Sequence, residues 1–349
     1  MSEVTDQSTV SFAFADAQSR ISHLSDLRPV TAVLSPLTFK PIFMERIWGG
    51  RKLADLFEKK LPSGERIGES WEIVDRPEAQ SVVTSGLFKG KTLHELWSQH
   101  RDEVFGKVPR GPSPTGLARF PLLIKILDAR EKLSLQVHPP GKVAAKLGGE
   151  SKTECWYVAA AEAGAELFVG FKESVSREQF EKALRAGSAQ DHVHSISAKQ
   201  GDVMFLPAGR FHGIGGGNVL VEVQQNSDTT YRVFDWNRVD QSGKPRQLHL
   251  DQALECIDFN DVSPKLTQPQ GELLIKNDFF EIQKWNLASP REVTPPGQFA
   301  IVCCLSGAGS CADVDLCPGE FFLVPASAPD RQIKPRTEGT TLLRVTIPR

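Results

Sequence analysis

The 349-residue sequence has no long hydrophobic run and no excess of either charge. Its longest apolar stretches, such as residues 299–309, fall far short of the roughly 20 residues that cross a bilayer as a helix. Lys and Arg number 41 and Asp and Glu 43, a net charge of −2, which gives no general attraction to nucleic acid or anionic membranes. The polar first residues lack the basic and apolar segments of an export signal. We therefore expect a soluble, cytoplasmic protein with a small-molecule partner, no nucleic acid and no membrane.

Cysteine is also scarce, with six residues and no pair spaced as CxxC. This number is too small for a disulfide scaffold and indicates a reducing compartment with free thiols. Four of the cysteines crowd together at Cys303, Cys304, Cys311 and Cys317. Their spacing fits a zinc knuckle poorly. We expect them to be buried apolar residues.

The hydrophobic pattern changes at residue 37. Residues 1–36 show no sustained apolar period and are expected to form a loose N-terminal extension. After them, short β-rich runs alternate with Gly, Pro, Asn and Asp, which predicts antiparallel strands and a mainly β fold. We expect three short helices, at residues 93–106, 177–186 and 250–257, the second after a capping box of Ser176 and Gln179. The lack of regular strand and helix alternation argues against a parallel sheet.

One segment occurs twice. GDVMFLPAGRFH, residues 201–212, aligns with GEFFLVPASAPD, residues 319–330, at a constant offset of 118 residues. This repeat predicts a duplicated β-module. The second copy has Asp330 where the first has His212, and nothing like the QVH of residues 136–138 precedes it. We therefore expect one functional module and one scaffold module.

Candidate metal ligands lie at the ends of the β-rich runs. In KLSLQVHPP, Gln136 and His138 are two residues apart, so on a strand both project from one face, with Ser134 behind them. Glu154 has the same spacing from Lys152, and His212 follows a turn. Two histidines, one carboxylate and one amide oxygen suit a first-row divalent metal with open positions. A single histidine on a strand is more often structural, so the combination carries the prediction.

With these segments in place, the chain resembles class I mannose-6-phosphate isomerases of the short bacterial type, which are bicupin zinc enzymes. The matching segments span roughly residues 37–258 and are FKPIFMERIWGG (39–50), GESWEI (68–73), FPLLIKILDA (120–129), KLSLQVHP (132–139), KTECWYV (152–158), LPAGRFHGIG (206–215) and QQNSDTTYRVFDWNR (224–238).

The resemblance implies two cupin-like jelly-roll barrels with a few short helices, the second barrel degenerate. It implies a metal-binding catalytic domain over residues 37–258, a degenerate domain over residues 259–349 and one Zn²⁺ per chain. The family's site residues fall on metal ligands Gln136, His138, Glu154 and His212, on catalytic Arg232 and Lys152, and on substrate-binding Ser134, Lys125 and Asp228.

The residue types suit an aldose–ketose isomerisation of a phosphosugar. This reaction moves a proton between adjacent carbons through an enediol(ate) and needs a Lewis acid, a base and fixed cations. Lys152 and Arg232 can hold phosphate or enediolate charge. The base stays open among Lys152, Asp228, Glu222 and a metal-bound hydroxide. Without the motif, Arg232 could equally form a structural salt bridge to Asp228 or Asp235.

Two other functions fit parts of the pattern. Two histidines and a carboxylate also suit iron in a cupin oxygenase, although Gln136 and the nearby cations favour a phosphosugar enzyme. A non-catalytic sugar-binding bicupin would bind without turnover. The sequence does not decide between a monomer and a homodimer.

Overall fold

The computed structural model describes residues 1, 34–108, 118–239 and 243–348 of the chain. From Leu34 onward the chain forms one compact unit. Most of the expected N-terminal extension, residues 2–33, lies outside the described residues. Leu34, which the sequence pattern assigned to that extension, is buried in a hydrophobic cluster. The division at residue 258 stays a prediction.

The first module is a pair of antiparallel sheets. One is six-stranded, in the order β11-β8-β13-β6-β3-β2, and the other is five-stranded, in the order β10-β9-β12-β7-β14. The six-stranded sheet consists of β2 (Ile42–Gly50), β3 (Ile67–Ile73), β6 (Leu122–Ala129), β8 (Glu154–Ala161), β11 (Val203–Leu206) and β13 (Asn218–Gln225). The five-stranded sheet consists of β7 (Leu135–Val137), β9 (Glu166–Phe171), β10 (Val193–Ser197), β12 (His212–Ile214) and β14 (Tyr231–Phe234).

The second module is another pair of sheets, joined by a short strand from the beginning of the described unit. Its six-stranded sheet, in the order β1-β21-β18-β23-β16-β15, consists of β1 (Leu37–Thr38), β15 (Leu273–Lys276), β16 (Glu281–Asn286), β18 (Ala300–Ser306), β21 (Phe321–Val324) and β23 (Thr341–Thr346). The four-stranded sheet, in the order β17-β22-β19-β20, consists of β17 (Arg291–Glu292), β19 (Gly309–Cys311), β20 (Val314–Leu316) and β22 (Gln332–Pro335). A separate hairpin pairs β4 (Asp75–Arg76) with β5 (Ala79–Gln80).

The alternation of side chains along each strand explains how the sheets stack. In β8, Trp156 and Val158 pack between the two sheets of the first module. Cys155 and Tyr157 point to the opposite face and pack against the six-stranded sheet of the second module. A further cluster fills the second module. The two six-stranded sheets therefore lie back to back, and the predicted mainly β, cupin-like fold class is confirmed.

Helices are few and short: α1 (Lys52–Phe57), α2 (Leu93–Gln99), α3 (Arg101–Val104), α4 (Gly141–Ala144), α5 (Arg177–Arg185), α6 (Leu250–Cys256) and a 3₁₀ turn at Ala189–His192. The capping box of Ser176 and Gln179 before α5 is confirmed. The single helix expected at residues 93–106 is wrong, because the chain leaves helical geometry at His100 and forms α2 and α3. α1 and α4 were not predicted, since each is too short for a helical period.

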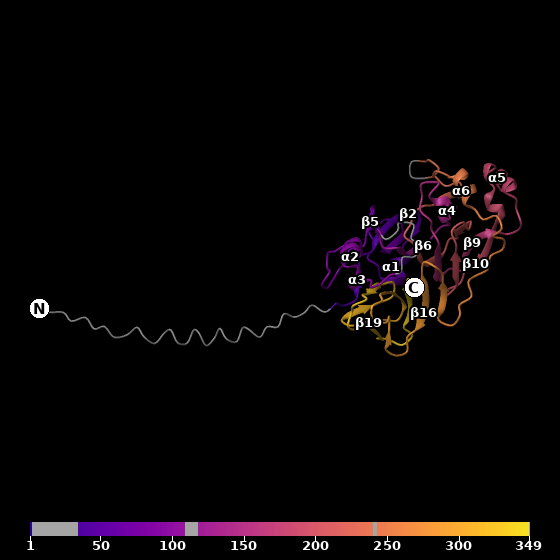
Figure 1. Ribbon diagram of the computed structural model, residues 1–349. Helices are drawn as coiled ribbons and strands as arrows, with labels where there is room; N and C mark the ends of the chain where they lie inside the picture. The colour runs from indigo at the N-terminus through magenta and orange to yellow at the C-terminus, as the bar shows by residue number, and fades with distance from the viewer. Residues whose placement is uncertain (2–33, 109–117, 240–242, 349) are drawn as a thin grey trace. The chain divides into compact units, whose positions relative to one another are not determined.

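Helices α5 and α6 cover the outer face of the five-stranded sheet, where they close a cluster with β7, β9 and β14. Figure 1 shows them near β9 and β10, away from the C-terminal strands β16 and β19. None of the helices in the described part of the chain has the length and apolar character needed to span a bilayer.

The repeated segment forms matching strands in the two modules. β11 and β21 are again 118 residues apart; β11 pairs with β8, whereas β21 pairs with both β18 and β1. Leu206 of β11 lies opposite Glu154, and its counterpart Val324 lies opposite Ala300. The second module therefore has an alanine where the first has a candidate metal ligand.

Of the crowded cysteines, Cys303, Cys304 and Cys311 are buried, as expected. The expectation is wrong for Cys317, which is exposed because it follows the end of β20 in a turn. All six cysteines are free thiols.

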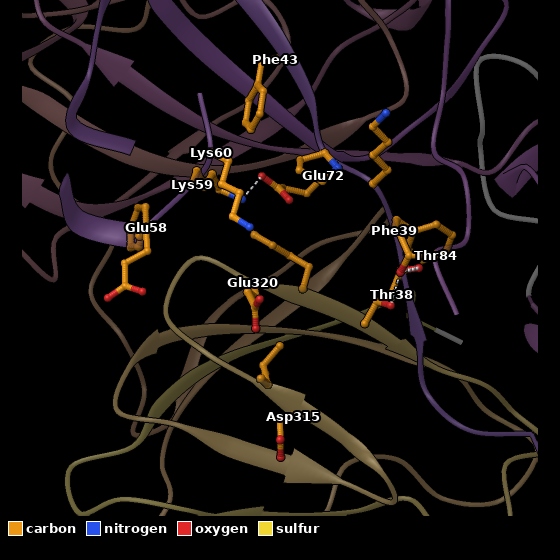
Figure 2. Close-up of a pocket in the computed structure, with 15 residues that line it drawn as sticks. Thr38, Phe39, Phe43, Glu58, Lys59, Lys60, Glu72, Thr84, Asp315 and Glu320 are labelled. Carbon is orange, nitrogen blue, oxygen red and sulfur yellow. Dashed lines mark hydrogen bonds and ion pairs between the residues drawn. The ribbon is translucent and has the colours of Figure 1, made fainter. Parts of the chain in front are cut away.

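A cavity of about 530 Å³ lies between the two modules. Figure 2 shows two groups of residues that line this cavity. Lys59 and Glu72, joined by an ion pair, come from the first module, and Asp315 and Glu320 come from the second module. The Lys59 Nζ to Glu72 Oε1 distance is 2.7 Å, and both side chains are more than nine-tenths buried. Ser70 donates a further hydrogen bond to Glu72 Oε1.

Candidate metal centre and active site

The five-stranded sheet places three polar side chains in one row. His212 of β12 lies opposite Gln136 of β7, and Gln136 lies opposite Arg232 of β14. Tyr231 and Val233, on either side of Arg232, pack in the outer cluster under α5 and α6. Because neighbours in a strand point to opposite faces, Arg232, Gln136 and His212 all face the interior of the first module.

His138 follows β7, and Glu154 begins β8 of the facing sheet. His138 Nε2 is 3.5 Å from Glu154 Oε2, and His212 Nε2 is 3.4 Å from Glu154 Oε1. One ligand atom from each of these three buried residues lies within 4.8 Å of the others. Across the described residues, no second group of three or more His, Cys, Asp or Glu side chains has this geometry.

Both histidines are held with Nε2 directed at the carboxylate. His138 Nδ1 donates to the carbonyl of Thr229 at 2.8 Å, and His212 Nδ1 donates to the carbonyl of Arg210 at 2.9 Å. A neutral imidazole that donates from Nδ1 has a lone pair on Nε2. These backbone contacts therefore fix the tautomer that a metal ligand requires.

The donor set fits a divalent cation. Both oxygens of Glu154 are buried, and the two imidazole Nε2 atoms and the Lys152 ammonium lie within 3.5 Å of them. Burial raises the pKa of Glu154, but the charge of Lys152 outweighs burial and the pKa lies well below its usual range. Burial lowers the pKa of His212 to about 3, although the charge of Glu154 opposes the shift, so this imidazole is neutral. An anionic carboxylate and neutral imidazoles are the forms that bind metals.

Gln136 completes the set as a fourth donor. Its Nε2 lies 3.3 Å from His212 Nε2, and its Oε1 lies 3.3 Å from Ser134 Oγ. A half-turn of the amide presents Oε1 to the ring nitrogens and leaves an N–H for the serine. Ser134 thus contacts Gln136, and its predicted substrate contact stays a prediction.

Lys152 is a cation beside the candidate ligands. Its Nζ lies 2.7 Å from Glu154 Oε2 and 3.3 Å from His138 Nε2. It is also 3.7 Å from Glu222 Oε1. Burial lowers the pKa of Lys152, but the charges of Glu154 and Glu222 outweigh burial and raise it above its usual range. Lys152 is therefore an ammonium, which can donate a proton but cannot accept one.

The six-stranded sheet contributes a second row, across β8, β13, β6 and β3: Trp156, Glu222, Lys125 and Trp71. Trp156 donates its Nε1–H to Glu222 Oε2 at 3.0 Å. Lys125 Nζ lies 3.6 Å from Glu222 Oε1 and 4.8 Å from the centre of the Trp71 ring. Lys125 is also 4.0 Å from Oδ1 of the half-exposed Asp228. The predicted substrate residues Lys125 and Asp228 therefore lie together.

Glu222 is the carboxylate best suited to accept a proton. Burial raises its pKa, although Lys152 and Lys125 oppose the shift. Its Oε1 is buried and accepts no hydrogen bond. The sequence pattern gave Glu222 only as one of four candidate bases. Its position between Val221 and Val223, which face the opposite cluster, is the signal that places it inside.

Glu69 was missed as a site residue. It lies in β3, all of whose residues are buried, and is 3.6 Å from Lys125 Nζ. Burial raises its pKa, but the charges of Lys125 and Arg46 and a hydrogen bond from Trp71 lower it to about 2. A charged residue within a wholly buried run is the signal that could have identified it.

Among the residues that the structure describes, Arg232 has no carboxylate partner. Its Nη1 donates to the carbonyl of Gln247 at 2.9 Å, and its buried Nε has no hydrogen-bond partner. Burial lowers its pKa, and the charge of Arg246 adds to this shift. In the described residues, neither Asp228 nor Asp235 forms an ion pair with Arg232, which removes the salt-bridge alternative. The guanidinium is free to bind an anion.

A buried His-Glu-His set between two antiparallel sheets, next to lysines and an arginine, defines a metal enzyme of the cupin class. Comparison with known proteins gives the family. Residues 37–163 match the family model described as "Phosphomannose isomerase type I, catalytic domain". The chain is 38% identical over 283 residues to the mannose-6-phosphate isomerase ManA of Bacillus subtilis, covering 78% of this chain and 86% of the relative.

Two further comparisons agree. The mannose-6-phosphate isomerase of Streptococcus mutans is 37% identical over 281 residues, covering 78% of this chain and 86% of the relative. A crystal structure of the mannose 6-phosphate isomerase from Bacillus subtilis superposes with a TM-score of 0.78 at 34% identity, covering 90% of this chain and 100% of that one. The chain belongs to the type I mannose-6-phosphate isomerase family, whose members are aldose–ketose isomerases. The predicted family and enzyme class are confirmed.

Proposed function

We propose that this protein interconverts D-mannose 6-phosphate and D-fructose 6-phosphate with one zinc ion per chain. The substrate comes from the relatives' names, and one observation in this chain carries the proposal. The buried donor set of His138, Glu154 and His212 lies between a carboxylate of raised pKa, Glu222, and an arginine without a carboxylate partner, Arg232. An isomerase of phosphosugars needs these three parts in one space.

The metal would be held by His138, Glu154, His212 and Gln136. Two imidazoles, a carboxylate and an amide oxygen suit zinc with room for substrate. When bound, zinc polarises the carbonyl and hydroxyl oxygens of the sugar as a Lewis acid. One ion per chain is expected, because the second module has Ala300 in the place of Glu154.

Proton transfer is assigned to Glu222. Its carboxylate takes the proton from carbon 2 of mannose 6-phosphate, giving an enediol(ate), and returns that proton to carbon 1, while the hydroxyl proton passes from oxygen 2 to oxygen 1 to complete the ketose. The pKa of Glu222 is raised towards neutral pH, and a general base is most effective when its pKa lies near the pH at which the enzyme works. Trp156 fixes one of its oxygens and leaves the other open. Lys152, an ammonium, stabilises charge that develops on the substrate oxygens.

The phosphate is assigned to Arg232. Lys152 already contacts two carboxylates, and Lys125 lies close to three. Within the described part of the chain, the guanidinium of Arg232 hydrogen-bonds to a backbone carbonyl and to no carboxylate, in contrast to the two lysines. A guanidinium binds phosphate with planar, bidentate geometry.

The experiment is to incubate the purified, zinc-loaded protein with mannose 6-phosphate and to follow fructose 6-phosphate. We expect turnover that stops on chelation and returns with zinc, and elemental analysis should give one zinc per chain. Glu154→Gln should lose both metal and turnover, whereas the matched change Glu162→Gln, at an exposed pair with Lys52, should keep both. Oxygen uptake, or metal binding without any turnover, would overturn the proposal in favour of an oxygenase or a sugar-binding protein.

A further inference from the structure

The end of strand β14 carries a second group of charges that the proposed reaction does not use. Asp235, directly after the strand, is buried and accepts hydrogen bonds from two arginines. Arg246 binds it with Nε at 2.7 Å and Nη2 at 2.5 Å, and Arg238 binds it with Nη2 at 2.5 Å. Two guanidiniums are thus paired with one carboxylate, and the charges of all three groups act on the nearby Arg232.

The segment of residues 246–249 connects this group to Arg232. Gln247, next to Arg246, accepts the hydrogen bond from Arg232 Nη1. His249 donates its backbone N–H to the Arg232 carbonyl at 2.8 Å and accepts from the Arg232 N–H through Nδ1 at 3.2 Å. The segment therefore contacts Arg232 at three points. The Asp235 to Arg246 pair ties this segment to the end of the strand that carries Arg232.

The backbone between Asp235 and Arg238 has an uncommon conformation. Trp236 and Asn237 have φ angles of 58° and 55°, in the left-handed region that non-glycine residues rarely adopt. Trp236 is held there by its Nε1–H, which donates to the carbonyl of Leu133 at 2.6 Å. The turn brings Arg238 back onto Asp235, whose carbonyl accepts the Arg238 N–H at 3.1 Å. Such strain is retained where surrounding contacts enforce a required geometry.

We propose that Asp235 is a positioning residue that, by pairing with Arg238 and Arg246, holds the 246–249 segment and through it the guanidinium of Arg232 where the substrate phosphate binds. The proposal rests on the proposed function for the identity of the phosphate. Asp235 also neutralises two guanidiniums that would otherwise compete with Arg232 for the same anion. Asp235 therefore has two effects: it orients the guanidinium of Arg232, and it prevents the phosphate from binding at Arg238 or Arg246 instead.

The test is Asp235→Asn, which keeps the shape and removes the charge. We expect kcat/KM for mannose 6-phosphate to fall about 10- to 100-fold, because a misplaced binding group costs that much. Affinity for inorganic phosphate, measured by calorimetry on the zinc-loaded protein, should rise about threefold at low ionic strength, because one unit of negative charge a few ångströms away is gone. If Asp235 had a purely structural role, Asp235→Asn would lower the stability of the protein but would not lower kcat/KM while raising the affinity for phosphate.

Glu272→Gln is the matched control, since Glu272 pairs with both Nη atoms of Arg291 at 2.7 and 2.8 Å, away from the site. It should change neither quantity. If Asp235→Asn does not fold, Arg246→Gln tests the same link, and it should lower kcat/KM without tighter phosphate binding. The proposal would be overturned if the variant that folds had the same kcat/KM and the same phosphate affinity as the wild-type protein. If the wild-type protein fails to turn over mannose 6-phosphate, the calorimetric comparison still tests Asp235.

Discussion

The pKa of each buried carboxyl group in the site is set by its burial together with the charges next to it. Glu69 lies between Lys125 and Arg46, and its pKa falls to about 2. The pKa of Glu154, next to Lys152, also lies below its usual range. Glu222 faces the same lysines, but the charges of Glu154 and Glu69 add to its burial and keep its pKa raised. A site of mainly anionic carboxylates thus contains one that can take a proton.

Arg232→Ala should remove anion binding without unfolding the protein. Turnover should fall about 10² to 10³-fold, the typical cost of one missing charge-stabilising donor. Metal content and the melting temperature should stay nearly unchanged, because the side chain contacts only the Gln247 carbonyl. Arg232→Lys should recover part of the activity, since it keeps the charge and loses the planar fork. A variant that is less stable yet normally active once folded would show that Arg232 is structural.

Glu69→Gln should change how stability depends on pH. The pKa of Glu69 is about 2 in the folded protein, below its ordinary value of 4.5. The charged form therefore stabilises the fold above pH 4.5, and this contribution is lost as the pH falls towards 2. Between pH 5 and pH 3, the wild type should lose about 2 kcal/mol that the variant does not lose. Urea unfolding at both pH values checks this, and parallel losses in the two proteins would contradict it.

At the scale of elements, local sequence patterns could predict residues but not the pairing between strands. Gln136 and His138 were predicted because their two-residue spacing is visible in the sequence. The row that includes Glu222, Lys125 and Trp71 depends on the register of strands far apart in the sequence: Trp71 of β3 pairs with Lys125 of β6, 54 residues on, and Lys125 pairs with Glu222 of β13, a further 97 residues on. The helix expected at residues 93–106 was wrong, because apolar spacing does not show the change of direction at His100.

Strand β1 gives a prediction at this scale. Leu37 and Thr38 pair with Leu323 and Phe322 of β21, so a strand from the beginning of the described unit completes a sheet of the second module. Deletion of residues 2–33 should leave turnover and stability nearly intact, since that segment has no sustained apolar period. Deletion through Thr38 removes the buried Leu34 and Leu37 and should cost about 3 kcal/mol or more. Urea unfolding of both truncations checks this, and equal stabilities would contradict it.

At the scale of the whole molecule, the two modules share an architecture but differ in their polar residues. The two six-stranded sheets share a core, while the ligand set lies between the sheets of the first module only. The duplication at an offset of 118 residues could be predicted from the sequence, and its loss of ligands follows from Ala300 and Asp330. The back-to-back packing of the two modules could not be predicted from the sequence, because the alternation of residues in one strand does not show which other sheet its outer face contacts.

The buried Lys59–Glu72 pair, beside the cavity between the modules in Figure 2, gives the last prediction. Lys59→Met leaves Glu72 buried without its cation and should lower the free energy of unfolding by about 3–5 kcal/mol at pH 8. Burial raises the pKa of Glu72 even with Lys59 present, and removal of Lys59 raises it further. A raised pKa stabilises the fold at low pH and loses that effect as the pH rises. The variant should therefore be less destabilised at pH 5 than at pH 8.

The double variant Lys59→Met/Glu72→Gln serves as the control, because it removes both charges and should recover most of the lost stability at pH 8. Lys146→Met is the matched surface change, since Lys146 pairs with Glu255 in solvent and its loss should cost less than about 1 kcal/mol. Urea unfolding of the four proteins at both pH values gives the comparison. If Lys59→Met were as stable as Lys146→Met at pH 8, the buried pair would contribute no more to the free energy of unfolding than a pair at the surface.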